Sequence, residues 1–371
     1  MRVAAAPTSA GVRLETLELH DFRLFEAVEL APPPGISLIT GGNGAGKTSL
    51  LEAVFVLGHG RSFRGGSRAG LIRHGATAFR IHARWQLPDG GVRRTGLERS
   101  VRGWQARLDG RELEHLSELY RACSAVCFEP GSHALLAGAS EGRRQFLDWG
   151  LFHVEPGFLA LWRRYLRALR QRNALLKRAG AAAAELQPWE HELAEAGERL
   201  TALRAGHAQR LDAPIRNLCR QFLPELGAAA VRLQPGWPQQ AALGTALQAA
   251  RGRDLAAGFT TVGAHRDDWR LDFEALPARA PLSRGQEKLA ALACVLGQAQ
   301  ALTRAGAPWP VLLLDDLASE LDRPHQGKVW DLLQRMPAQV LITATESPDW
   351  WPLDRVGARF HVEQARVERL L

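Results

Sequence analysis

Residues 41–48 read GGNGAGKT, a complete G-x-x-x-x-G-K-S/T pattern of the kind that forms phosphate-binding loops. A short apolar run at 36–40 precedes the loop, and residues 48–55 follow it with helical spacing. This order of strand, loop and helix aims backbone N–H groups and a helix N-terminus at a bound phosphate. We expect Lys47 to reach the β- and γ-phosphates of a nucleotide and the Thr48 hydroxyl to hold Mg²⁺. The residues expected to bind the nucleotide here are Gly41, Gly42, Asn43, Gly44, Ala45, Gly46, Lys47, Thr48 and Ser49.

Two adjacent acids close a predicted buried strand near the C-terminal end. The apolar run at 311–314 is followed directly by Asp315 and Asp316. A Walker B strand needs one acid for Mg²⁺ and one beside the water that attacks the nucleotide. We therefore expect Asp315 to bind Mg²⁺ together with Thr48, and Asp316 to be the catalytic residue that orients or deprotonates the water.

A third motif lies about two dozen residues before these acids. Residues 282–288 read LSRGQEK and lead into an apolar helical stretch at 289–296. The heptapeptide resembles the signature of the ABC ATPase superfamily, in which a serine and glycine N–H groups bind the γ-phosphate held by another subunit. Taken alone, it is also compatible with an ordinary helix cap. The resemblance adds Ser283, Gly285 and Gln286 to the expected nucleotide-binding residues.

Composition is typical of a globular protein. The 371 residues are 46% hydrophobic and 23% charged, and no apolar stretch approaches the roughly 20 residues needed to cross a bilayer. Residues 1–13 lack the apolar core of a signal peptide, so we expect a loose N-terminal extension there. The four cysteines form no C-x-x-C pair. A cytoplasmic protein without a membrane partner is therefore expected.

The basic charge favours an anionic partner. The formal net charge is +8 and the pI is about 10.0, and nearly all basic residues are arginines. A GC-rich coding bias produces the same balance without any role in DNA binding, so the positions of the arginines matter more than their number. Seven bases crowd a predicted helix at 158–178, where either DNA binding or simple solvation accounts for them. They are Arg163, Arg164, Arg167, Arg170, Arg172, Lys177 and Arg178.

The pattern of apolar residues predicts an α/β fold with two parts. Residues 14–30 and 79–87 alternate as strands, and the turn at 88–91 closes a hairpin. Its outer face carries arginines as far as Arg111. This face either binds nucleic-acid phosphates or is merely solvated. The character changes to helical in the middle of the chain. We expect an ABC-type P-loop ATPase head with mixed β-sheets, formed by 14–128 and 256–371. A helical insertion subdomain at 129–255 should contain two antiparallel helices, with a break between them from Ala179 to Pro188.

Motifs along almost the whole chain are similar to those of the RecF family, bacterial recombination-mediator ATPases. The matching stretches are 17–23 (LELHDFR), 42–53, 60–64 (GRSFR), 143–148 (RRQFLD), 172–177 (RNALLK), 263–268 (GAHRDD) and 315–322 (DDLASELD). The resemblance implies a clamp that dimerises on ATP and binds DNA at single-strand gaps, at junctions of single- and double-stranded DNA, or on duplex. It also implies help to RecO and RecR in loading RecA, with slow ATP hydrolysis resetting the clamp.

The chain departs from the family pattern at two places. Ala264 replaces a common proline, and residues 127–132 carry no intact Q-loop form and receive no metal ligand. Two other positions follow RecF usage but differ from most ABC ATPases. Thr345 stands where ABC transporters have a histidine, and Asp316 stands where most ABC ATPases have glutamate, which predicts slow hydrolysis.

Alternative functions are an ABC transporter subunit or the head of another SMC-like chromosome protein. The basic helical insertion and the absent histidine disfavour the transporter. The stretch between Thr48 and Ser283 already contains sheet and helices, so it leaves no long heptad arm for an SMC protein. A nucleolytic ATPase would need a further acidic domain after 315–316, where only about fifty residues remain.

Overall fold

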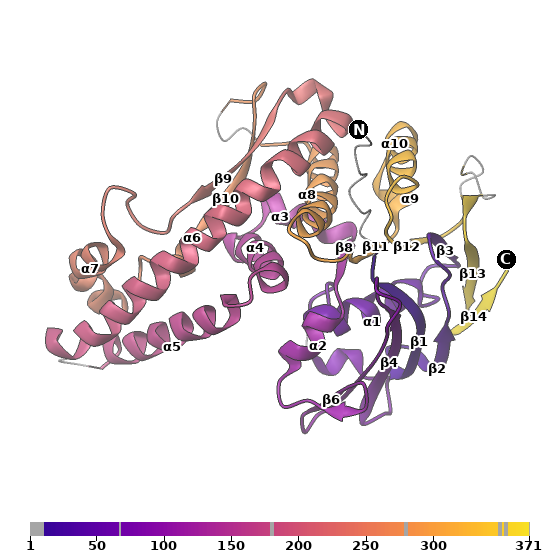
Figure 1. Cartoon of the computed structure of the whole chain (residues 1–371), viewed down its shortest axis with the longest axis horizontal. Coiled ribbons are helices and arrows are strands. Elements are labelled where there is room, and N and C mark those ends of the chain that lie inside the picture. Colours follow the sequence, from indigo (N-terminus) through magenta and orange to yellow (C-terminus); the bar gives the residue numbers. More distant parts are fainter. Residues whose placement is uncertain are drawn as a thin grey trace, which may run out of the picture. The chain divides into compact units, whose positions relative to one another are not determined.

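The computed structural model describes residues 11–66, 68–178, 182–277, 281–347, 351 and 355–370. The chain forms two compact units (Figure 1). One consists of Met1–Ser132 with Arg284–Leu371, and the other is His133–Ser283. Below they are called the head unit and the helical unit.

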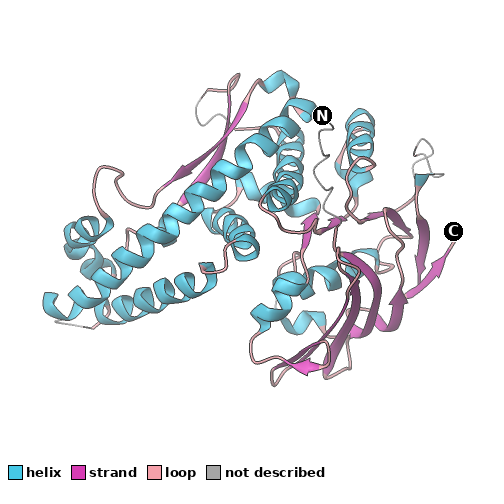
Figure 2. Ribbon diagram, viewed as in Figure 1, coloured by secondary structure: helices cyan, strands magenta, loops and turns pink. Residues whose placement is uncertain are grey.

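Two six-stranded sheets form the framework of the head unit (Figure 2). The first is antiparallel, with the order β2-β1-β4-β5-β6-β7. Its strands are β1 (Arg13–Phe22), β2 (Phe25–Leu30), β4 (Ala78–Gln86), β5 (Val92–Ser100), β6 (Trp104–Leu108) and β7 (Arg111–Glu112). The predicted alternation in β4 is confirmed, because Phe79, Ile81, Ala83 and Trp85 are buried while Arg80, His82 and Arg84 are exposed.

The second sheet has the order β14-β13-β3-β12-β11-β8, and its neighbours are parallel except for the β13–β14 pair. Its strands are β3 (Ile36–Thr40), β8 (Ala125–Phe128), β11 (Val311–Leu314), β12 (Val340–Ala344), β13 (Ala358–Glu363) and β14 (Arg366–Arg369). Every residue of β3, β11 and β12 is buried, as expected for central parallel strands covered on both faces.

Helix α1 (Lys47–His59) is the central element of the head core. Eleven of its thirteen residues are buried, and its side chains join those of both sheets in one hydrophobic cluster. The remaining helical elements of the unit are η1 (Arg68–Leu71), α2 (Leu116–Ala122), α8 (Arg284–Arg304), α9 (Leu317–Glu320) and α10 (Arg323–Leu333); η2 (Pro130–His133) spans the boundary. Because α1 begins at Lys47, its burial fixes the start of the helix relative to both sheets.

The helical unit is built on two long helices that pack side by side, α5 (Phe158–Leu176) and α6 (Ala183–Phe222) (Figure 1). Its core includes Tyr165 and Leu200 from these helices and Leu243 from a third. The other elements are α3 (Ala134–Ala137), α4 (Ser140–Val154), η3 (Pro224–Leu226), β9 (Ala229–Gln234), α7 (Leu243–Ala257), η4 (Ala264–Arg266) and β10 (Asp268–Phe273).

The division of the chain differs from the expected one. Residues 256–283, expected in the head, belong to the helical unit, because β10 pairs antiparallel with β9 and η4 contacts α6. Residues 129–132 belong to the head. Residues 11–13 are also part of the head, since the Val12 N–H donates to Trp309 O and β1 begins at Arg13. Residues 1–10 lie outside the described residues.

The break expected between the two long helices is shorter than predicted. Helix α6 begins at Ala183 and contains both Pro188 and Pro214. Proline removes one helical hydrogen bond, and the packing of the long apolar face of α6 onto α5 compensates for this loss.

A buried ion-pair network joins distant parts of the helical unit. Arg204 of α6 donates to both carboxylate oxygens of Asp148 at 2.8 Å and to Asp267 Oδ2 at 2.9 Å. Asp267 also accepts a hydrogen bond from Thr201 at 2.7 Å and from the Gly236 N–H at 2.9 Å. Asp267 is fully buried. Among the described residues, these donors are the groups that hydrogen-bond to its carboxylate.

We predict that Arg204→Ala destabilises the helical unit by about 3–5 kcal/mol, because Asp267 is left as a buried charge without its cation. The exposed Arg210 on the same helix provides the matched control, and Arg210→Ala should change stability by less than about 0.5 kcal/mol. Urea unfolding followed by tryptophan fluorescence measures both. Equal midpoints for the two variants would contradict the assigned role of the network.

Candidate functional site

The loop between β3 and α1 has a backbone that only glycine fits at two positions. Gly41 has a φ of 150°, and a Cβ there would lie 2.1 Å from Val362 O. Gly46 has a φ of 118°, and a Cβ there would lie 2.6 Å from a ring carbon of Phe25. Positive φ and close neighbours both exclude a side chain. The glycines of the motif therefore shape the loop that the sequence predicts.

Lys47, the first residue of α1, curls back over this loop. Its Nζ donates to Gly41 O at 2.7 Å and to Gly42 O at 2.9 Å. Burial lowers the pKa of the Lys47 ammonium, while the negative charges of Asp316 and Asp315 oppose that shift. The ammonium therefore lies within electrostatic reach of both predicted acids.

Asp315 connects three elements of the site. Its Oδ1 accepts a hydrogen bond from Thr48 Oγ1 at 2.9 Å and another from Thr343 Oγ1 at 2.6 Å. Burial raises the pKa of Asp315, and the two hydroxyl hydrogen bonds oppose this rise. The structure thus brings together Lys47, Thr48 and Asp315, three residues that the sequence singled out in separate motifs. A hydroxyl and a carboxylate on one side of a phosphate loop form a donor set that suits Mg²⁺.

Asp316 has an unusual backbone and an unpaired oxygen. Its φ of 51° and ψ of 37° are left-handed, a conformation that aspartate adopts more readily than most residues. Its N–H donates to Thr343 Oγ1 at 2.8 Å. Its Oδ1 is buried and has no hydrogen-bond partner among the described residues. A buried carboxylate oxygen without a partner is expected where a water or a ligand completes the site. The left-handed turn also gives a physical reason for aspartate at a position where glutamate is usual.

Motif reading missed Thr343, which is fully buried on β12 and hydrogen-bonds to both acids. A lone threonine inside an apolar strand gives no pattern by which a sequence could reveal this. Arg64 was also missed as a site residue. Its positive charge acts on Asp315 and opposes the rise in the pKa of that acid. The only sequence signal for Arg64 is its place in the matched stretch 60–64.

Glu52, one turn into α1 from Thr48, explains two further matched stretches. It is completely buried, and Arg23 donates to its two oxygens at 2.6 and 2.8 Å. Ser62 also donates to it. Arg23 and Ser62 therefore fasten the segments 17–23 and 60–64 to the helix that follows the phosphate loop.

The signature stretch lies at the start of α8. Ser283 directly precedes the helix, and Gly285 and Gln286 are in its first turn. Lys288 Nζ lies 2.9 Å from Glu320 Oε2, so this turn is tied to the segment after the two acids. Thr345, at the position of the absent histidine, accepts a hydrogen bond at its backbone oxygen from the Gly41 N–H at 3.3 Å.

The basic residues of α5 do not form one uniform surface. Arg163, Arg167 and Arg170 are exposed, as are Lys177 and Arg178 just after the helix. Arg164, however, pairs with Glu192 and Glu195 of α6, and Arg172 is fully buried against Asp254. The sequence left DNA binding or simple solvation to account for all seven bases. Arg164, Arg172 and also Arg178, which pairs with Glu185, are instead engaged by carboxylates of other segments.

The matched stretch 263–268 has a structural role in the helical unit. His265 Nδ1 lies 2.7 Å from the Tyr165 hydroxyl, and burial lowers the pKa of this histidine to about 4. Asp268 pairs with Arg143 at 2.6 Å, and Asp267 belongs to the Arg204 network.

No helix among the described residues is long and apolar enough to cross a membrane.

Comparison with known proteins gives consistent matches. The family model described as the RecF/RecN/SMC N terminal domain matches residues 13–366. The DNA replication and repair protein RecF of Stenotrophomonas maltophilia is 51% identical over 361 residues, covering 96% of this chain and 99% of that protein. The same protein of Edwardsiella ictaluri is 36% identical and covers 95% and 99%.

Solved structures agree on the fold. A structure of the recombination mediator protein RecF with ATP matches with a TM-score of 0.89 and 24% identity, covering 99% of this chain and 100% of that one. The Smc head domain of Pyrococcus furiosus matches with a TM-score of 0.56 and 17% identity over 97% and 96%. The expected mixed α/β head fold is confirmed by these likenesses. The family model and the curated relatives together establish that the chain belongs to the RecF family of DNA replication and repair proteins.

Proposed function

We propose that this chain is an ATPase that binds ATP with Mg²⁺, dimerises around two ATP molecules and binds DNA at single-strand gaps or at junctions of single- and double-stranded DNA. The observation that carries the proposal is the meeting of Lys47, Thr48 and Asp315 at the phosphate loop. Membership of the RecF family and the likeness to a RecF structure with ATP support it. Assistance to RecO and RecR in loading RecA belongs to the same proposal and rests on the family alone.

The loop residues in this mechanism bind and orient the phosphates. Backbone N–H groups of residues 42–49, other than those of Ala45 and Ser49, which already donate to Gly42 O and Gly46 O, would bind phosphate oxygens. The Lys47 ammonium would exchange its two carbonyl partners for phosphate oxygens. Mg²⁺, when bound, neutralises phosphate charge and orients the oxygens for in-line attack. Thr48 and Asp315 would hold it, and the short Thr343 hydrogen bond keeps the Asp315 carboxylate in place.

Asp316 positions the attacking water in this proposal. Its buried Oδ1 has an open acceptor site, and its backbone is held by Thr343. Because an aspartate is one methylene shorter than the usual glutamate, its contact with the water is weaker. We infer slow hydrolysis, which resets the dimer and powers no stroke. Ser283, Gly285 and Gln286 of the other chain complete each ATP-binding site.

The proposed DNA contact in the helical unit uses the exposed bases of α5, chiefly Arg163, Arg167 and Arg170. Guanidinium groups bind phosphate oxygens in bidentate fashion, and such contacts depend strongly on salt. A transporter subunit is not favoured, because the family model and curated relatives are those of DNA repair proteins.

The first prediction of this mechanism concerns Asp316→Asn. Asparagine also adopts the left-handed backbone, so the loop should be preserved while the carboxylate is removed. We expect ATP binding to persist and single-turnover phosphate release to slow by about a hundredfold or more. Hydrolysis at the parental rate would show that Asp316 has no such role.

A companion pair of variants tests how Asp316 is held. Thr343→Val removes the hydroxyl and should lower kcat more than it raises KM, because both acids remain but lose their shared support. Thr343→Ser keeps the hydroxyl and should restore most of the rate. Similar losses in both variants would indicate a packing effect instead.

The second prediction tests the composite site. Lys47→Ala and Ser283→Arg homodimers should each fail to close on ATP, since both of their sites are damaged. In the mixed heterodimer, one site combines an intact phosphate loop with an intact signature. We expect ATP-dependent crosslinking between differently labelled chains in the mixture and little in either variant alone. Crosslinking in the mixture no greater than in the separate variants, with efficient parental crosslinking, would argue against the trans site.

The third prediction concerns DNA. Reversing the charge of Arg163, Arg167 and Arg170 should weaken DNA binding and reduce the slope of log K against log salt by about 0.7–0.9 per lost phosphate contact. The control reverses three exposed arginines of the head, Arg304, Arg335 and Arg366, which changes net charge equally. If both triple variants show the same slope in fluorescence anisotropy, α5 is only a solvated surface.

A further inference from the structure

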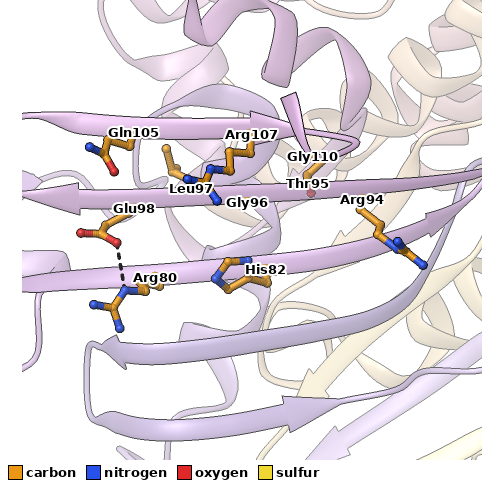
Figure 3. A pocket seen from close by; sticks show the side chains of 10 residues that line it. All are labelled: Arg80, His82, Arg94, Thr95, Gly96, Leu97, Glu98, Gln105, Arg107 and Gly110. Carbon is orange, nitrogen blue, oxygen red and sulfur yellow. Dashed lines mark hydrogen bonds and ion pairs between the residues drawn. The ribbon is translucent and has the colours of Figure 1, made fainter. Parts of the chain in front are cut away.

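A hollow of about 340 Å³ lies on the outer face of the antiparallel sheet in the head unit, opposite the face that packs on the core. Gly96 of β5 lies among its lining residues, where the absence of a side chain leaves the strand backbone open. The side chains around it come from three neighbouring strands (Figure 3). They include Arg80, His82, Arg94, Glu98, Gln105 and Arg107.

The strand register places donors on opposite sides of Gly96. His82 of β4 and Arg107 of β6 are its direct partners, and both are exposed. Figure 3 shows these two side chains flanking Gly96, with Arg94 further along the same strand. A Cβ at position 96 would lie 3.1 Å from His82 Nδ1. A side chain larger than a methyl group at position 96 would therefore fill the centre of the hollow.

Two of the three guanidinium groups around the hollow have no partner among the described residues. Arg80 is occupied by Glu98 at 2.9 Å. In contrast, the side chains of Arg94 and Arg107 make no hydrogen bond or ion pair with any described residue, even though Glu112 lies opposite Arg107 in register. The carboxylate inside the hollow is thus already neutralised, and two cations face solvent. The hollow has an unmet preference for an anion.

The extent of this preference is limited to β4, β5 and β6. On β1 and β2 the same face carries two acids. Glu18 of β1 lies opposite His82 of β4 on one side and opposite Glu29 of β2 on the other. Arg84, next to the hollow, is engaged by Glu15 at 2.6 Å. We therefore expect an anion to bind at the hollow and not elsewhere on this face of the sheet.

We propose that the Gly96 hollow binds a phosphate group of a nucleic-acid backbone, as a DNA contact in the head unit that is additional to α5. This inference rests on the proposed function as a DNA-binding protein. Small-molecule sites usually have apolar walls that bury the ligand, whereas this hollow is rimmed by exposed polar side chains. Unpaired arginines on an open surface suit a phosphate that belongs to a long polyanion, because each contact adds counterion release.

The test measures binding of a fluorescent gapped duplex to the full chain, with ATP and Mg²⁺, by anisotropy between about 50 and 200 mM salt. Arg94→Ala/Arg107→Ala should weaken binding and reduce the salt slope by about 1.4–1.8, the value for two lost phosphate contacts. Arg94→Lys/Arg107→Lys keeps both charges and should retain most of the slope. The control Arg304→Ala/Arg335→Ala loses the same net charge from exposed head positions and should behave like the parent.

A further variant blocks the hollow without removing any arginine. Gly96→Glu places a carboxylate between Arg94 and Arg107 and should weaken DNA binding as the double alanine variant does. Gly96→Ala adds only a methyl group, which the exposed His82 side chain can yield to, and should bind DNA normally. Binding of a fluorescent ATP analogue and thermal unfolding, which should match the parent, report on folding.

The outcomes separate the two proposals. If the parent itself does not bind DNA, the proposed function fails. If the parent binds and the Arg94/Arg107 and Gly96→Glu variants keep the parental slope, the hollow is not a DNA contact and this inference is overturned. A second outcome also overturns the inference. Inorganic phosphate, followed by ³¹P NMR, or an acidic peptide would bind the parent but not the variants, while the variants bind DNA as the parent does.

Discussion

The Asp315 carboxylate is the point on which the geometry of the site depends. Its Oδ1 accepts hydroxyl hydrogen bonds from Thr48 at the start of α1 and from Thr343 on β12. These contacts require β12 to lie between β3 and β11, as the strand order of the parallel sheet provides. Because the carboxyl ends of parallel strands meet at one edge, the phosphate loop after β3 and the acids after β11 face each other there.

The same edge carries the buried polar groups that a core would otherwise exclude. Asp315 is 3% exposed and Thr343 is fully buried. Charges at such depth are stable only when every neighbour supports them, and here the hydroxyls and the Lys47 ammonium do so. Asp316 is the exception, since its Oδ1 has no partner among the described residues and its backbone is left-handed. An unmet acceptor on this sparsely populated backbone conformation supports the proposed catalytic role.

The helical unit also contains buried charges that are stabilised by pairing. Its matched stretches meet within the unit, where Arg143 pairs with Asp268 and Arg204 of α6 links Asp148 to Asp267. Such pairs fix how α4, α6 and β10 meet, and removing one partner leaves an uncompensated charge. Arginine in this chain therefore has three roles: internal pairing, exposed charge on α5, and the unpaired groups around Gly96 in the head.

The sequence by itself determined the local features of this protein. The glycine spacing predicted the phosphate loop, the alternation at 79–87 predicted β4, and the apolar runs predicted the buried strands, because each depends on residues adjacent in the chain. Only the tertiary structure decided which strands are neighbours. It therefore also decided that Thr343 reaches Asp315, that Arg172 is buried and not exposed on α5, and that residues 256–283 join the helical unit. These three features depend on contacts between residues tens to hundreds of positions apart, which no local pattern encodes. The periodicity of a helix or strand shows which of its faces is buried, but it does not show which other element that face packs against.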